Sequence, residues 1–121
     1  MSTIVLVDNS KLITEIIGEQ LSDNTDFGGY QVIKVDTYAT AIEHLQHSDF
    51  DFLITASYLD QGHYGTALIQ QCEKPSLLIS HDDVEYKADA VGAGFINKNR
   101  GFLNRRIHDW IIRQPRLVTL N

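Results

Sequence analysis

A short apolar segment near the middle of the chain is the feature that most limits the fold. Residues 52–56, Phe-Leu-Ile-Thr-Ala, follow the acidic Asp51 and lead into a polar, glycine-containing loop at 60–65. A run of this length between turn signals is typical of a strand buried on both faces. Such strands lie inside parallel sheets, and the reactive groups of α/β proteins gather at their carboxyl ends. The residue at this end is Ala56, which carries no reactive group.

Predicted strands and helices alternate along the whole chain. Short apolar runs predict strands at 4–7, 30–35, 51–56, 76–80 and 95–96. Apolar residues at helical spacing, with Ser10 and Thr37 among the candidate N-caps, predict helices at 12–21, 38–45, 65–73, 83–91 and 102–113. Pro75 and Pro115 are expected to end two of these helices, and 24–29 is expected to be a loop. Five βα repeats imply a parallel sheet with right-handed crossovers and helices on both faces.

Length and composition predict one folded domain. Hydrophobic residues make up 43% of the 121 residues, close to ordinary globular usage. We expect the domain to span 1–114, with 115–121 as a tail or the start of a linker to an output domain. The single cysteine, Cys72, excludes an intrachain disulfide. No apolar run approaches the ~20 residues of a membrane span, and no basic signal segment precedes the first strand, so we expect a cytoplasmic domain.

Charge is distributed unevenly over a net −6. Residues 1–96 contain 4 Lys/Arg and 15 Asp/Glu, which gives −11, whereas 97–121 contain 6 Lys/Arg and 1 acid, which gives +5. The basic last helix can orient an acidic protein partner. The acidic bulk argues against nucleic-acid binding, and once the sheet is assigned no helix-turn-helix remains. Neither a GxGxxG motif nor a P-loop is present.

One histidine pair has spacing that suits a metal site. His44 and His47 fall three residues apart on the predicted second helix. No third ligand is indicated nearby, so we interpret them as exposed helix residues and expect neither a metal nor a cofactor.

Several motifs at the predicted strand ends resemble the response-regulator receiver family of two-component signalling. They are Asp8 after the first strand, Asp-Phe-Asp-Phe-Leu-Ile at 49–54, Ser80 after Leu-Leu-Ile, and Gly-Ala-Gly-Phe-Ile-Asn-Lys at 92–98. The resemblance covers residues 4 to 113. It implies a flavodoxin-like (βα)5 three-layer sandwich, in which a central five-stranded parallel sheet has the order 2-1-3-4-5.

The resemblance also implies roles at the strand ends. In the family, two acids after strand one hold Mg²⁺, an aspartate ending strand three accepts a phosphoryl group, and a hydroxyl and a lysine bind its oxygens. An aromatic residue in strand five moves with the hydroxyl. The matching residues here are Asp8, Ser80, Phe95 and Lys98, whereas Asn9 replaces the second acid and Ala56 replaces the acceptor. Asn99 stands where the family has proline, so no cis peptide bond is expected there.

The substitutions remove phosphoryl chemistry from this site. A methyl group cannot be phosphorylated, and with Asp8 as the one remaining acid no stable Mg²⁺ site is expected. We expect Asp8 and Lys98 to form an ion pair that closes the pocket. Ser57 would point to the opposite face if the strand continued, and Asp60 lies in the loop. Neither is therefore expected to replace the acceptor.

These observations lead to two functional hypotheses. The first is an atypical receiver, not an enzyme, that acts in a phosphorelay-type pathway through phosphorylation-independent protein contacts. Its candidate partner face includes Arg105 and Arg106, which we expect to project outward, near Trp110 and Phe102, which we expect to lie mainly in the core. An acidic partner or a second copy of the chain fits this face. The short span from 80 to 98 also predicts a shortened fourth helix.

The alternative is a small-molecule or anion-binding regulatory domain that uses the vacated pocket beside Ala56. Its candidate ligand-recognition residues are Asn9, Ser57, Ser80 and Lys98.

Overall fold

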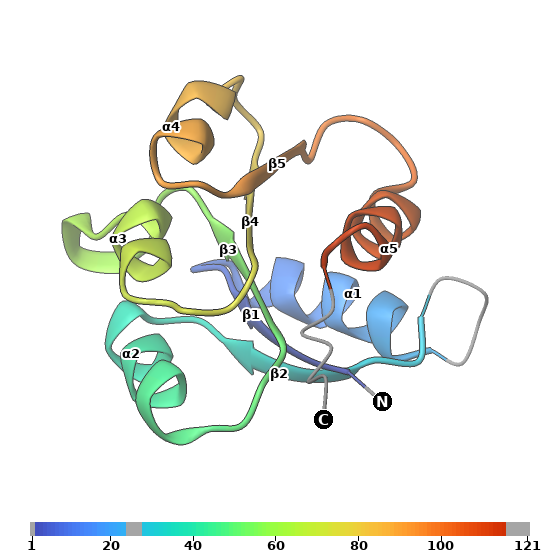
Figure 1. The fold of residues 1–121 in the computed structure, drawn as a ribbon, viewed down its shortest axis with the longest axis horizontal. Helices are drawn as coiled ribbons and strands as arrows, with labels where there is room; N and C mark the ends of the chain where they lie inside the picture. The colour runs from blue at the N-terminus through green and yellow to red at the C-terminus, as the bar shows by residue number, and fades with distance from the viewer. Residues whose placement is uncertain (1, 24–27, 116–121) are drawn as a thin grey trace.

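The computed structural model describes residues 2–23 and 28–115 and contains one parallel sheet (Figure 1). Its strands are β1 (Thr3–Val7), β2 (Gln31–Val35), β3 (Phe52–Ala56), β4 (Ser76–Ser80) and β5 (Gly94–Asn97). They are hydrogen-bonded in the order β2-β1-β3-β4-β5. The predicted flavodoxin-like fold is confirmed, and β3 is the central strand.

Helices cover both faces of the sheet (Figure 1). They are α1 (Lys11–Ser22), α2 (Tyr38–His47), α3 (Gly65–Gln70), α4 (Glu85–Ala90) and α5 (Leu103–Ile112), with a 3₁₀ turn, η1, at Asp60–Gly62. Helices α1 and α5 lie side by side on one face, and α2, α3 and α4 lie on the other. The described helices include none that is long and apolar enough to cross a bilayer.

The strand side chains divide into two cores, as the pleat of a buried strand requires. Leu6, Ile54 and Ile79 pack with the apolar residues of α1 and α5. Val5 and Leu53, which point to the opposite face, pack with residues of α2, α3 and α4. Burial on both faces holds the strand ends at one edge of the sheet, where the candidate site lies.

Hydroxyl side chains begin the first two helices, as expected. The Ser10 hydroxyl accepts a hydrogen bond from the Ile13 backbone N–H at 3.3 Å, and the Thr37 hydroxyl accepts one from Thr40 N–H at 3.2 Å. Each bond satisfies a helix N-terminal N–H that has no intrahelical acceptor. Helix α4 has only six residues and no side-chain N-cap, which agrees with the shortening expected from the sequence.

Two local predictions were wrong. Helix α3 ends at Gln70 rather than near residue 73 and does not extend to Pro75, because the Gln71 backbone N–H already bonds the Leu68 carbonyl. Phe102 does not join the core: its side chain is 79% exposed and its φ is 61°. Most of the loop expected at 24–29 and most of the tail expected at 115–121 lie outside the described residues.

A polar contact joins the start of β2 to α5. The Tyr30 hydroxyl lies 2.6 Å from His108 Nδ1. Burial raises the pKa of Tyr30 above its usual value, because the charged phenolate is disfavoured away from water. The hydroxyl therefore stays in its neutral form and can donate to His108 Nδ1 in the tautomer that leaves this nitrogen unprotonated.

Candidate functional site

The carboxyl ends of β1, β3 and β4 and the residue after β5 meet around one cavity. Its volume is about 360 Å³, and its lining includes Asp8, Ala56, Ser80 and Lys98. Asn9 also lines it and is exposed. Parallel strands bring these residues together although up to 90 positions separate them along the chain. The structure thus gathers the pocket residues that the sequence indicated.

Asp8 and Lys98 form the expected ion pair. Lys98 Nζ donates to Asp8 Oδ2 at 2.7 Å, and the two side chains are 9% and 3% exposed. The second carboxylate oxygen, Oδ1, accepts the Ser10 backbone N–H at 2.9 Å. The Lys98 backbone N–H donates to the Ser80 carbonyl at 2.7 Å. Both ions are therefore held by short hydrogen bonds in a site with little access to water.

Ala56 presents a methyl group at the end of the central strand. The residue is 4% exposed, and its carbonyl lies against Gly65, whose backbone N–H bonds the Ser57 carbonyl at 2.9 Å. Ser57 lines the same cavity as Ala56, contrary to the expectation that it would point to the opposite face. The alternation of strand side chains does not extend to Ser57, because β3 ends at Ala56.

Asp60 has a structural contact away from this cavity. Its Oδ1 accepts the backbone N–H of Tyr38 at 2.7 Å, at the first residue of α2. A carboxylate at a helix N-terminus is favoured by the orphan N–H groups and the helix dipole. This contact supports the expectation that Asp60 does not replace the missing acceptor.

Ser80 and Phe95, which match the hydroxyl and aromatic positions of the family, do not line the same cavity. The Ser80 hydroxyl accepts the Asp82 backbone N–H at 3.1 Å and lines the cavity beside Ala56. Phe95 is half-buried against the α2–α4 core and lines a different cavity, with Tyr86 and Arg106. The two positions that the family couples therefore face different cavities in this chain.

The residues around Asp8 do not fit Mg²⁺. The ion prefers octahedral oxygen coordination with at least one or two carboxylates. Asp8 has one oxygen bonded to Lys98 and the other to Ser10, and Ala56 offers no ligand. The described residues contain no group of three His, Cys, Asp or Glu side chains that could hold a metal. His44 instead contacts the Ser48 hydroxyl at 2.8 Å.

The charges that line the cavity balance. Asp8 and Asp82 carry two negative charges, and Lys87 and Lys98 carry two positive charges. Lys98 is neutralised by direct contact with Asp8, and Lys87 Nζ lies 5.7 Å from the centre of the Tyr64 ring. An anion would therefore meet little excess positive charge. The sequence interpretation missed Lys87 and Tyr64, because loop and helix positions near the strand ends follow no simple spacing rule.

The expected partner face on α5 needs correction. Arg106 is not directed freely outward, since Nη1 donates to the Asn97 carbonyl at 2.9 Å. Trp110 is 9% exposed and packs edge-on against Phe52, with ring centres 5.9 Å apart. These two residues hold α5 on the sheet, and Arg105 is the exposed member of the set.

Comparison with known proteins identifies the architecture. No family model and no curated protein matches the sequence. The solved chemotaxis response regulator CheY4 of Vibrio cholerae is similar, with a TM-score of 0.77, 22% identity, and coverage of 93% of this chain and 98% of that one. A response regulator receiver domain from Clostridium thermocellum has a TM-score of 0.79 and 15% identity, with coverage of 93% of this chain and 92% of that one. The BeF₃-activated DrrB receiver domain has a TM-score of 0.75 and 20% identity, with coverage of 93% of this chain and 96% of that one.

The chain has the receiver-domain fold. At these identities the likeness is one of fold, and a fold by itself does not determine a function. The chemistry of this receiver fold must be argued from its own residues, above all Asp8, Ala56 and Lys98.

Proposed function

We propose that the chain is an atypical receiver domain that works in a two-component-type pathway through protein contacts and without phosphorylation. In this proposal it is a binding module, not an enzyme. The observation that carries the proposal is Ala56, a buried methyl group at the end of the central strand, beside a lysine that is already paired.

The ion pair supports a mechanism without a phosphoryl group. A phosphoryl ligand would have to draw Lys98 away from Asp8 and leave that carboxylate buried without its partner. Such a separation is costly, because each ion in a poorly hydrated site depends on the other. In the proposed mechanism the Asp8–Lys98 pair stays closed, and the domain binds its partner without any change of charge in the pocket.

Beryllofluoride with Mg²⁺ is expected to leave the amide NMR spectrum unchanged. This mimic of an aspartyl phosphate needs a carboxylate at the acceptor position and a bound Mg²⁺, and Ala56 and the engaged Asp8 supply neither. Acetyl phosphate with Mg²⁺ should likewise produce no shifts. Shifts that cluster at Asp8, Ser80 and Lys98 would contradict the proposal.

A double variant provides the positive control for this measurement. Asn9→Asp/Ala56→Asp returns two carboxylates to the cavity, and beryllofluoride with Mg²⁺ should then shift the amides of Ser80 and Lys98. Asn9→Asp/Ala90→Asp adds the same charge but places the second carboxylate on exposed α4, and it should show no such shifts. The contrast tests whether the missing acceptor, rather than the net charge, explains the silence of the native chain.

The cavity beside Ala56 supports a second candidate function, small-molecule binding. Its volume of about 360 Å³ falls within the range of ligand pockets, and Ser57 and Ser80 can donate hydrogen bonds. Anions are disfavoured by the Asp8–Lys98 pair. A thermal-shift screen of neutral nucleosides and sugars alongside nucleotides and phosphorylated metabolites separates the two functions, because a ligand that binds only the folded state raises the melting temperature.

A further inference from the structure

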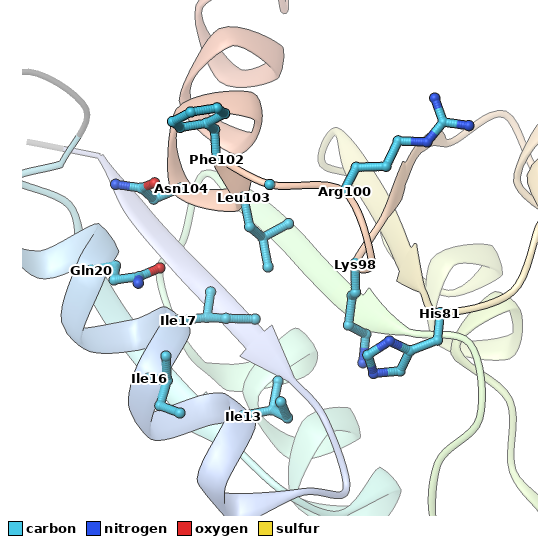
Figure 2. A pocket seen from close by; sticks show the side chains of 11 residues that line it. Ile13, Ile16, Ile17, Gln20, His81, Lys98, Arg100, Phe102, Leu103 and Asn104 are labelled. Atoms are coloured by element: carbon cyan, nitrogen blue, oxygen red, sulfur yellow. The ribbon is translucent and has the colours of Figure 1, made fainter.

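A groove runs between α1 and α5. It shares Lys98 with the Ala56 cavity at one end, but its apolar residues are separate from that cavity. This α1–α5 groove has a volume of about 470 Å³ and is lined by Ile13, Ile16, Ile17, Phe102 and Leu103, with Lys98 at one end. Figure 2 shows the three isoleucines on α1 facing Leu103, with Phe102 at the rim. Neither the pocket chemistry nor the proposed function explains this surface.

Large apolar side chains stand exposed at the groove, Ile16 and Phe102, and one helical turn from Ile16, Leu12. Leu12 is 68% exposed, Ile16 is 45% exposed and Phe102 is 79% exposed. Leu12 and Ile16 are one helical turn apart and therefore share a face of α1. Several large exposed apolar side chains at and beside a groove mark an interaction surface, whereas a single exposed leucine does not.

The backbone holds Phe102 in an unfavourable conformation. Its φ of 61° and ψ of 43° lie in the left-handed region, which residues with a Cβ rarely adopt. The adjacent Gly101 does not have a positive φ, although a glycine would adopt one without strain. The chain thus maintains a strained aromatic residue at the rim of the groove, and its ring is directed to solvent.

We propose that this face joins two copies of the chain in a twofold symmetric dimer, with Phe102 of each copy seated in the α1–α5 groove of the other. The protruding ring and the groove lie next to each other on one surface. A twofold axis through that surface would fill both grooves at once, which is the defining property of an isologous interface. The proposal goes beyond the proposed function and does not depend on the Ala56 cavity.

The distribution of charge favours a second copy as the occupant. The exposed acid of this face, Glu19, lies on α1 three residues from Ile16, whereas Glu15 is paired with Lys34 of β2, and no acid lines the groove. The exposed basic residue Arg100 lies on the opposite side of the groove, before α5. A twofold axis that places α1 of one copy against α5 of the other brings opposite charges together at both rims.

Sedimentation equilibrium of the full chain tests the dimer. The native chain should approach twice its mass of 13.7 kDa with rising concentration. Phe102→Glu should raise the dissociation constant of the dimer by about tenfold or more, because a charge replaces the aromatic ring that is buried in the interface. Ile112→Glu, a matched change at a 62% exposed residue of the same helix but outside the groove, should not weaken it.

A second variant separates loss of the interface from loss of the fold. Phe102→Gly relieves the left-handed backbone and removes the ring, so it should be monomeric and melt at or above the temperature of Phe102→Glu. In a mixture of differently labelled copies, nuclear Overhauser effects should join the Phe102 ring of one copy to the Ile13 and Ile16 methyls of the other. A native chain that is monomeric at every concentration overturns the proposal, as does a dimer that withstands both Phe102 variants. Binding of a different protein to this face of a monomeric chain overturns it as well.

Discussion

Lys98→Met is expected to lower the free energy of unfolding by about 3–5 kcal/mol, because it leaves a carboxylate buried without its counter-ion. Asp8 is 3% exposed on its side chain, and its contact with Lys98 Nζ is 2.7 Å. The Ser10 N–H that remains can satisfy only one of the two oxygens. Urea unfolding followed by circular dichroism measures the loss as a lower midpoint at an unchanged slope.

The double variant and a surface control show whether burial causes the effect. Asp8→Leu/Lys98→Met replaces both ions by apolar groups and should recover most or all of the loss, since a well-packed apolar pair can match a buried ion pair. Lys34→Met breaks the Lys34–Glu15 pair, whose side chains are 42% and 54% exposed, and should cost less than about 1 kcal/mol. Equal losses for Lys98→Met and Lys34→Met would show that the buried pair has no special role.

The ion pair could be predicted from the sequence because few alternatives remained. Once the strands were assigned, Asp8 and Lys98 had to reach the same edge of the sheet, and the two other carboxylates of the family site were absent. A buried charge requires a partner, so the one acid and the one lysine were expected to meet. The resemblance to the receiver family, together with topology and electrostatics, predicted this contact without any knowledge of loop geometry.

Contacts that depend on the backbone conformation of loops could not be predicted from the sequence. The side of the sheet on which Ser57 lies depends on where β3 ends, and the spacing rule fails one residue beyond the strand. The exposure of Phe102 depends on a left-handed backbone that its residue type does not favour. Helical periodicity placed Phe102 in the core with Trp110, and only Trp110 lies there. Sequence patterns thus predicted the sheet, the site and a partner face on the last helix, but they did not predict that Phe102 stands exposed beside a groove with α1.

Gly65→Ala is expected to lower the free energy of unfolding by about 1–3 kcal/mol, because the first residue of α3 packs directly on the end of β3. A Cβ at this position would collide with the Ala56 carbonyl oxygen and lie 2.8 Å from Thr55 Oγ1. Both neighbours belong to the central strand, and Thr55 is fully buried, so they can move only if the strand end moves. The higher helix propensity of alanine offsets part of this cost, but it cannot remove the collision.

Gly101→Ala is the matched control for this effect. A Cβ at Gly101 meets no atom within 4 Å, and its φ is not positive, so at concentrations where the chain is monomeric the variant should be neutral or up to about 1 kcal/mol more stable. Gly65→Ala should also shift the amide signals of Ala56 and Ser57, since the Gly65 N–H bonds the Ser57 carbonyl at 2.9 Å. Equal stability of the two variants and unchanged Ala56 signals would contradict this prediction. They would show that close packing of α3 against β3 does not fix the position of Ala56. The geometry of that position would then depend on β3 and its neighbouring strands alone.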